Sequence, residues 1–391
     1  MGIATRFGLA CLLLSASGAR AAVYDLPPPG EDLVGEPSSI ESKEGDTLAQ
    51  ISLDNAVGFR QVLHANPQVD PWNVPPHTHI VLPTSMLLPA QPREGIVINI
   101  PEMRLFYYPK GEDKVYVYPV AVGRVDWRTP LGTTKVVRKI RNPTWYPTED
   151  IRAEHAAQGD PLPAAVPPGP DNPMGTLALQ LAWPLIRIHG TNAALAGIGM
   201  PVTHGCVRLY PQDIDDLFDR VPIGTKVTVL DQPYKFGHHD SFWYIEAHAE
   251  VTENAFTPGA HDVAPTLVKL RRSRGGSTLD WNLVAAALKR MDGVPAPVEP
   301  VPASIAPPAL TQPSEPMPTA APRITHTSYS PPHGGPKQNG ADPKIGATNQ
   351  EKLRLFALRL LVVLSLLLAV GVVVGRRVAR RVRLHRGDFR L

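Results

Sequence analysis

Residues 188–209 read IHGTNAALAGIGMPVTHGCVRL, and the chemistry expected of the chain follows from this stretch. It contains Cys206, with His204 two residues before it and His189 seventeen residues before it. A thiol reacts as its thiolate, and a neighbouring imidazole can take the proton. Gly205 allows a sharp turn in which backbone N–H groups converge on an oxyanion. The stretch therefore offers a nucleophile, a base and oxyanion donors.

Two other interpretations of these residues stay open on spacing alone. His189, His204 and Cys206 could be three ligands of a catalytic zinc ion that keeps one open position. A lone cysteine is also often a small buried hydrophobic residue. In the catalytic case Arg208 would favour the thiolate, because a nearby cation stabilises a charged form of opposite sign.

The pattern also matches a known signature. His189-Gly190-Thr191, followed by Thr203-His204-Gly205-Cys206-Val207-Arg208-Leu209, resembles the motif of the YkuD-type L,D-transpeptidases: a histidine, a spacer, then Ser/Thr-His-Gly-Cys. Three upstream segments resemble the same family: 95–105 (GIVINIPEMRL), 142–145 (NPTW) and 169–175 (GPDNPMG). Within the family, the chain is similar to the branch that includes enzymes attaching an outer-membrane lipoprotein to peptidoglycan.

The resemblance implies a peptidoglycan L,D-transpeptidase that uses no cofactor or metal. Cys206 would attack the carbonyl of the third residue of a tetrapeptide stem, release the terminal D-Ala and hold the acyl group as a thioester. His189 would be the general base. The backbone N–H groups of His204, Gly205 and Cys206 would form the oxyanion hole. The acceptor would be an amine on another stem peptide or on a lipoprotein lysine.

The same resemblance assigns roles to further residues. The carbonyl of Gly190 would orient His189, and Arg208 would hold the active-site loop or meet a substrate carboxylate. The residues expected to line the donor groove or hold its loops are Trp145, Asn172, Pro173, Met174 and Thr191. Two other functions remain as alternatives: a membrane-tethered anchor that binds peptidoglycan without catalysis, and a zinc peptidase that trims stem peptides.

Residues 94–232 are predicted to be a mainly β catalytic domain. Short alternating or aromatic runs between Pro/Gly turns are expected to form a sandwich or open barrel. These runs are Ile96–Ile100, Met103–Tyr108, Val115–Val122, Thr133–Ile140, Leu177–Leu181, Ile186–His189 and Val227–Leu230. One main helix, Pro211–Val221, is predicted from its first-position proline and its helically spaced apolar residues. Residues 233–293 are expected to be a C-terminal extension, with a strand at Phe242–His248 and a helix at Trp281–Met291.

Residues 38–83 are predicted to be a small α+β unit of two strands around two helices. The start Gly45-Asp46-Thr47-Leu48, the central Asn66-Pro67 and the final Ile80-Val81-Leu82-Pro83 resemble a LysM module. That resemblance implies binding to N-acetylglucosamine-containing glycan strands. The alternative is a packing subdomain without a ligand of its own.

Composition separates the two ends from the body. Of 391 residues 44 are proline, about twice the usual share, which excludes one compact domain over the whole length. The net charge is +3, but residues 1–21 carry +2 and residues 351–391 carry +8, so the middle carries −7. An acidic body is not the footprint of a nucleic-acid-binding protein, so that class of partner is excluded.

The N-terminal end, residues 1–22, reads as a secretory signal peptide. A basic start with Arg6 precedes the apolar run Phe7–Leu14, and Ala19-Arg20-Ala21 supplies a cleavage site. Cleavage after Ala21 or Ala22 would remove the other cysteine, Cys11, and leave Cys206 as the only one. No disulfide within the mature chain is then expected.

The C-terminal end predicts a tether. Residues 294–350 contain 14 prolines in 57 residues and are expected to be a disordered linker. Residues 355–375 form a 21-residue apolar run with one charge, long enough for one transmembrane helix. Seven arginines follow in residues 376–391, which places this tail in the cytoplasm. The expected location is the periplasm, with an anchor in the inner membrane.

Overall fold

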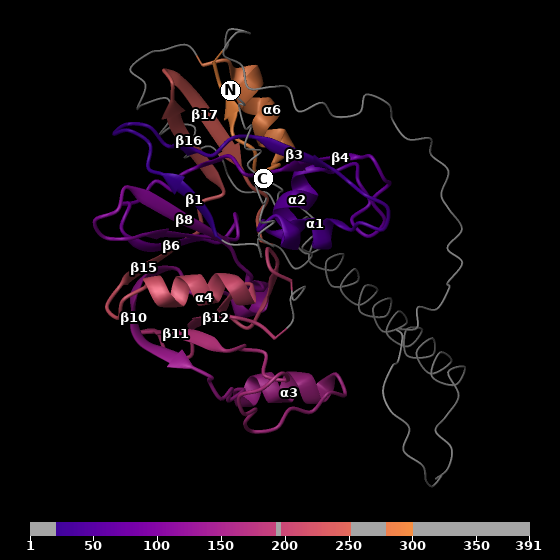
Figure 1. Ribbon diagram of the computed structural model, residues 1–391, viewed down its shortest axis with the longest axis vertical. Helices are drawn as coiled ribbons and strands as arrows, with labels where there is room; N and C mark the ends of the chain where they lie inside the picture. Colours follow the sequence, from indigo (N-terminus) through magenta and orange to yellow (C-terminus); the bar gives the residue numbers. More distant parts are fainter. Residues whose placement is uncertain (1–20, 193–196, 252–278, 300–391) are drawn as a thin grey trace, which may run out of the picture. The chain divides into compact units, whose positions relative to one another are not determined.

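The computed structural model describes residues 21–192, 197–251 and 279–299 (Figure 1). A nine-stranded sheet, ordered β1-β8-β7-β6-β15-β10-β11-β12-β14, forms the centre of the catalytic domain. Its strands are β1 (Ala22–Asp25), β6 (Gly95–Asn99), β7 (Arg104–Tyr108), β8 (Lys114–Pro119), β10 (Gly132–Arg141), β11 (Leu177–Leu181), β12 (Arg187–His189), β14 (Val207–Arg208) and β15 (Lys226–Leu230). The prediction of a mainly β fold is confirmed.

The long strand β10 joins the two halves of this sheet. Residues 132–135 pair with β15, and residues 136–141 pair with β11, with a register shift between Val136 and Arg138. A bulge bends a strand and increases its twist, so the sheet curls there. The sandwich-like arrangement is therefore one curled sheet and not two separate ones.

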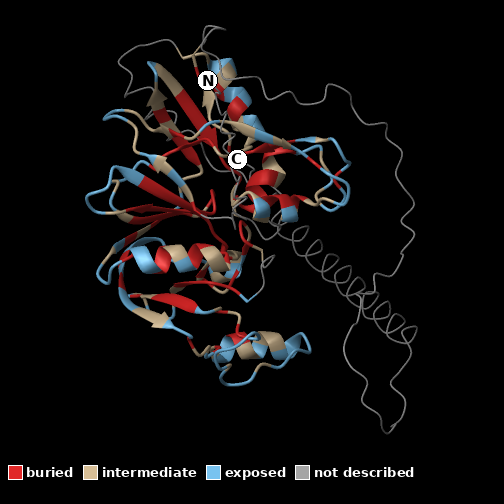
Figure 2. Cartoon of the chain, viewed as in Figure 1, coloured by how far each residue is buried: buried red, intermediate tan, exposed pale blue. Residues whose placement is uncertain are grey.

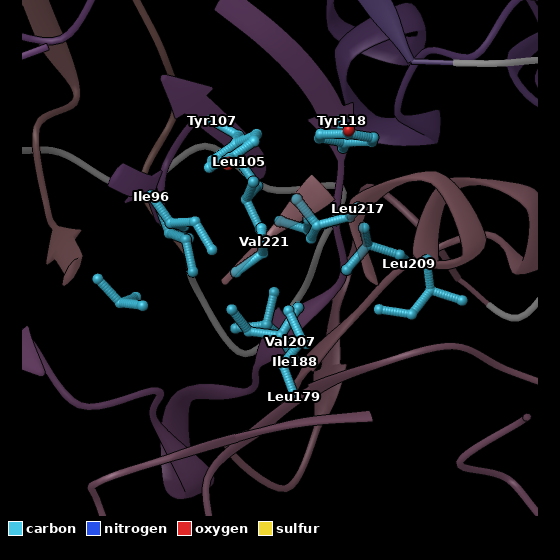
Figure 3. Packing of buried hydrophobic residues seen from close by; sticks show 14 of the residues in the cluster. Ile96, Leu105, Tyr107, Tyr118, Leu179, Ile188, Val207, Leu209, Leu217 and Val221 are labelled. Carbon is cyan, nitrogen blue, oxygen red and sulfur yellow. The ribbon is translucent and has the colours of Figure 1, made fainter. Parts of the chain in front are cut away.

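Helix α4 (Pro211–Arg220) packs into the curl of the sheet. Proline at the first helical position suits the helix start, because its missing N–H would have no partner there. In Figure 3, Leu217 and Val221 lie between Leu105 of one half of the sheet and Ile188 of the other. Burying each such side chain stabilises the fold by about 1.5–3 kcal/mol. The core thus fixes β12, from which the candidate base projects.

A second helix of the catalytic domain, α3 (Glu149–Ala157), accompanies the predicted main helix and has no counterpart among the predicted elements. Only Ile151 of this helix is buried, and Figure 2 shows the helix largely exposed. Apolar periodicity is therefore absent, although the cap gives a signal: the side chain of Thr148 accepts from the N–H of Ile151, and two acidic residues follow. The helix belongs to the flap, defined as residues 142–176 between β10 and β11.

Residues 38–83 form a small unit with its own core. β3 (Ser38–Glu41) pairs antiparallel with β4 (His79–Leu82), and α1 (Leu48–Asp54) and α2 (Phe59–Ala65) lie between them in the chain. This unit is the N-terminal module. Its core consists of Leu48, Ile51, Val57, Phe59, Val62, Val74, Ile80 and Leu82. Two short strands flank the module in the chain, β2 (Leu33–Val34) before it and β5 (Met86–Leu87) after it, and they pair with each other.

The C-terminal extension is a three-stranded sheet with one helix. β16 (Tyr234–His239), β17 (Phe242–Ala247) and β18 (Ala296–Pro297) pack with α6 (Trp281–Arg290). Val298 is fully buried, so the first residues assigned to the Pro-rich linker belong to this sheet. The composition of residues 294–350 as a whole does not reveal this short apolar run. Proline is tolerated in β18 because it is an edge strand.

A buried ionic cluster joins the extension to the central sheet. Lys235 Nζ lies 2.7 Å from Glu102 Oε2 and 3.0 Å from Glu246 Oε1. Arg104 contacts both carboxylates at 3.3 Å, and His248 Nε2 lies 2.6 Å from Glu246 Oε1. All five side chains are buried. Such a cluster is stable only while every charge keeps its partners.

The predicted ends of the chain lie almost wholly outside the described residues. The structure includes Ala21 and Ala22 of the expected signal peptide, and Ala22 begins β1 opposite Val117. The expected transmembrane run 355–375 and the tail 376–391 are not among the described residues. Within the described ranges, no helix has both the length and the apolar character needed to cross a membrane.

Candidate active site

Parallel pairing of β12 with β14 brings the two ends of the 188–209 stretch together. Ile188 lies opposite Val207 and His189 opposite Arg208, and the N–H of Leu209 donates to the carbonyl of His189 at 2.9 Å. Cys206 directly precedes β14. His189 and Cys206 therefore line the same cleft.

Cys206 lies on a turn between β13 (Pro201–Thr203) and β14. Gly205 has φ +99°, a backbone conformation that favours glycine. Thr203 Oγ1 donates to the carbonyl of Cys206 at 2.5 Å, and Thr129 Oγ1 donates to that of Gly205 at 2.9 Å. The Cys206 thiol lies 3.5 Å from the carbonyl oxygen of Leu185. Both hydroxyls therefore fix the backbone of the turn that carries the thiol.

His189 is buried and held in one orientation. Its Nδ1 lies 2.7 Å from the carbonyl oxygen of Gly190, which can only accept, so Nδ1 carries the proton. In the neutral ring Nε2 is then the basic nitrogen. Burial and the charge of Arg208 lower the pKa of His189 to about 3, although the carbonyls of Gly190 and Met174 favour the protonated ring. At neutral pH the imidazole can accept a proton.

The Cys206 thiol is also neutral at rest. Burial raises its pKa above the ordinary value. A backbone hydrogen bond at Arg187 and the charges of Arg187 and Arg208 lower it in part. Deprotonation must therefore accompany the reaction, with the proton passing to a base in the cleft.

The side chain of His204 contacts the flap. Its Nε2 lies 3.0 Å from Glu154 Oε2 on α3 and 3.2 Å from Arg124 Nη1. Arg124 Nη2 donates to both oxygens of Glu154 at 2.6 Å, and the ring of Trp127 packs edge-on against His204 at 5.0 Å. Among the described residues, the candidate ligand atoms of His189, His204 and Cys206 do not all lie within 4.8 Å of one another. This geometry does not favour the zinc interpretation.

A cleft of about 460 Å³ runs from Cys206 to the flap. Its apolar walls include Trp127, Trp145, Tyr146, Ile151, Leu185 and Val202. Its charged groups include Asp171, Arg187 and Arg208. A volume of this size suits a peptide segment, with the charged groups available for its carboxylates and amines.

The structure separates the predicted binding residues into two groups. Trp145, Pro173, Met174 and Arg208 line the cleft. Asn172 is fully buried beside it, and its amide donates to the carbonyls of Pro143, Val166 and Pro167 at 2.8–3.2 Å. It therefore holds the flap and does not face the cleft.

Two more predicted residues, Gly190 and Thr191, are buried behind the cleft. A Cβ on Gly190 would lie 2.8 Å from Ile214 Cγ2, so glycine allows β12 to approach α4. The sequence patterns did not point to several other cleft residues, among them Trp127, Leu185 and Arg187. A signal for Arg187 was its place two residues before His189 on one strand, since alternate residues share a face.

Comparison with known proteins identifies relatives of this chain. Residues 93–229 match the family model of the L,D-transpeptidase catalytic domain. The chain is 42% identical over 302 residues to "Probable L,D-transpeptidase YbiS" of Escherichia coli, covering 75% of this chain and 98% of that one. It is 40% identical to "Probable L,D-transpeptidase ErfK/SrfK" of Salmonella typhimurium, over 73% of this chain and 93% of that one.

Among solved structures, the catalytic domain of the E. faecium L,D-transpeptidase is similar at 21% identity and a TM-score of 0.27. The match covers 36% of this chain and all of that one. Because the chain is 42% and 40% identical to the two relatives above, over 98% and 93% of their lengths, it belongs to the L,D-transpeptidase family. Its activity is that of an L,D-transpeptidase.

Proposed function

We propose that Cys206 is the nucleophile and His189 the general base of L,D-transpeptidation on peptidoglycan stem peptides. The observation that carries this proposal is the parallel pairing of β12 with β14. This pairing puts His189 beside Arg208. Cys206 lies two residues before Arg208 in the chain, and it lines the same cleft as His189. A neutral imidazole next to a neutral thiol is the resting state that a general-base mechanism needs.

The first half-reaction transfers the stem to the enzyme. The thiol proton passes to His189 Nε2 as Sγ attacks the carbonyl carbon of the third stem residue. The resulting oxyanion is met by the N–H groups of His204, Gly205 and Cys206, which donate to no other described residue. The C–N bond to D-Ala then breaks, and the leaving amine takes the proton from His189. A thioester remains on Cys206.

The second half-reaction passes the acyl group to an amine acceptor. The amine attacks the thioester carbonyl and gives a proton to His189, and the C–S bond breaks as the thiolate regains that proton. The acceptor is a stem-peptide amine or a lipoprotein lysine. Arg187 and Arg208 would pair with substrate carboxylates, and Asp171 with a substrate ammonium, because these are the charges in the cleft.

The test is intact-mass spectrometry of the full chain mixed with a disaccharide tetrapeptide, with Cys206→Ala as control. We expect an adduct of the substrate minus D-Ala on the native chain only, followed by a cross-linked product, both unchanged in EDTA. Binding without loss of D-Ala would favour the non-catalytic anchor. Loss of activity in EDTA, restored by zinc, would favour the peptidase.

The module and the ends of the chain complete the proposal. The N-terminal module is a LysM-like unit that binds glycan strands, supported by its two helices between paired strands. The enzyme acts in the periplasm, and residues 355–375 anchor it in the inner membrane, as their apolar length suggests. Pull-down on peptidoglycan tests whether the module binds glycan strands. Membrane fractionation of a chain ending at residue 350, compared with the full chain, tests the anchor.

A further inference from the structure

The N-terminal module contacts the active-site loop, defined as residues 197–200, which directly precede β13. The N–H of Phe59 donates to the carbonyl of Ile198 at 3.2 Å, and the N–H of Arg60 donates to that of Gly199 at 3.3 Å. Amides in the first turn of a helix have no partner within the helix. The start of α2 thus finds its acceptors in the active-site loop.

The two backbones meet at a pair of glycines. Gly199 has φ +81°, and a Cβ placed on it would lie 2.4 Å from the nitrogen of Phe59 and 2.5 Å from Cα of Gly58. A Cβ on Gly58 would in turn lie 3.1 Å from Cα of Gly199. A side chain at Gly199 cannot fit unless the module and the loop move apart.

Apolar side chains cross this junction in both directions. Met200 of the loop packs against the core of the module. Leu53 of α1 packs against a cluster of Ile198 with Ala121 and Tyr210 of the catalytic domain. The junction is therefore packed as well as hydrogen-bonded.

The same loop residues are tied to the catalytic sheet on their other side. The N–H of Gly199 donates to the carbonyl of Val120 at 3.1 Å, and the N–H of Val122 donates to that of Met200 at 3.2 Å. β13 follows directly and pairs with β9 (Val122–Gly123), and its last residue, Thr203, bonds the carbonyl of Cys206. A continuous chain of contacts thus runs from α2 to the turn that carries the thiol.

We propose that the N-terminal module positions the nucleophile: it clamps residues 198–200 against Val120–Val122 and so fixes the turn at Cys206. This inference rests on the proposed role of Cys206. The module then contributes to the chemical step on stem peptides that carry no glycan at all. Misplacing a nucleophile by about 1 Å can cost about a hundredfold in rate.

The test compares Gly199→Ala with Gly111→Ala in the full chain, using a free tetrapeptide without sugars. Gly111 has φ +84°, so the control carries the same backbone strain, but a Cβ there meets nothing within 4 Å. We expect Gly199→Ala to lower kcat about tenfold or more with little change in KM, and Gly111→Ala to leave both unchanged. Equal kcat in the two variants would overturn the clamp.

A second variant and a second readout keep the result decisive. If Gly199→Ala does not fold, Met200→Ala removes the apolar contact without backbone strain. A lower kcat at unchanged Tm supports the clamp, and native kcat overturns it. If the native chain forms no thioester, the proposed function fails, and the clamp is then read from the rate at which iodoacetamide alkylates Cys206. The alkylation rate of Gly199→Ala should differ from that of the native chain, and the rate of Gly111→Ala should not. Equal alkylation rates in the native chain and Gly199→Ala would overturn the clamp.

Discussion

His204 Nε2 lies 3.0 Å from Glu154 Oε2, so the residue before Gly205 is tied to the flap over the cleft. Arg124 completes the contact by donating to both oxygens of Glu154. The flap carries Trp145 and Ile151 in the wall of the cleft. The side chain of the motif histidine thus holds one wall of the cleft in place.

Replacing Glu154 should loosen the flap. Glu154→Gln keeps the shape of the side chain and removes its charge, which weakens the bonds to Arg124 and His204. A half-buried ion pair contributes about 1 kcal/mol, so we expect KM for a stem tetrapeptide to rise about fivefold, with kcat nearly unchanged. Glu149→Gln, an exposed change on the same helix, is the matched control. Steady-state kinetics that gave the same KM for both variants would contradict the role of the pair.

The reactivity of Cys206 should depend on pH as that of a partly buried thiol does. Burial raises the pKa of this thiol above its ordinary 9, so the thiolate fraction, and the rate of alkylation by iodoacetamide, should still be rising at pH 9. Burial also lowers the pKa of His189 to about 3, so no imidazolium is present near neutrality. A rate that levels off below about pH 7 would reveal a thiolate–imidazolium pair and contradict this assignment.

His189→Ala separates reactivity from catalysis at the same site. Turnover should fall by about 10²- to 10⁴-fold, the usual contribution of a general base. The pH dependence of alkylation should stay close to native, because a neutral ring contributes no charge to the thiol. A large shift of that dependence would show that His189 is charged in the resting enzyme.

Local patterns predicted much of this architecture, and long-range contacts account for what they missed. The strand runs around Ile98, Phe106 and Leu179 were recognisable because they are short and almost wholly apolar, as expected for strands that are buried on both faces. The pairing of β12 with β14 could not be predicted from spacing, since it depends on α4 and the curl of the sheet. The buried cluster of Lys235 with Glu102 was not predicted, because charged side chains are rarely buried unless paired and the partners lie far apart in the sequence. The contact of the His204 side chain with Glu154 was not predicted, because Glu154 lies on a helix without apolar periodicity.

Asp213 should destabilise the folded protein as pH rises. It is buried near the start of α4, and neither carboxylate oxygen has a hydrogen-bond partner among the residues that the structure describes. Burial, with a contribution from Asp216, raises its pKa to about 8, well above the 3.8 of an exposed aspartate. The folded state therefore holds a proton that the unfolded state loses, so the stability is full below about pH 4 and falls progressively up to pH 8.

Asp213→Asn removes this titration. At pH 8 we expect the variant to be about 1–3 kcal/mol more stable than the native chain, with the difference shrinking toward pH 4. Urea unfolding at the two pH values measures it. The exposed change Asp219→Asn on the same helix should show no such pH-dependent gain. A constant difference at both pH values would mean that Asp213 is ionised in the folded state.

The ionic cluster beneath the C-terminal extension should be fragile to the loss of one member. Lys235→Met fills a similar volume but leaves Glu102 and Glu246 without the ammonium that bridges them. Removing one partner of a buried ion pair costs about 3–5 kcal/mol, because the remaining charge stays buried. Lys226→Met is the matched control, since Lys226 pairs with Glu94 at 2.6 Å on the exposed surface and such pairs contribute about 0–1 kcal/mol. Denaturant unfolding of the two variants measures the contrast. Equal, small losses would mean that the extension does not depend on the cluster for its attachment to the catalytic sheet.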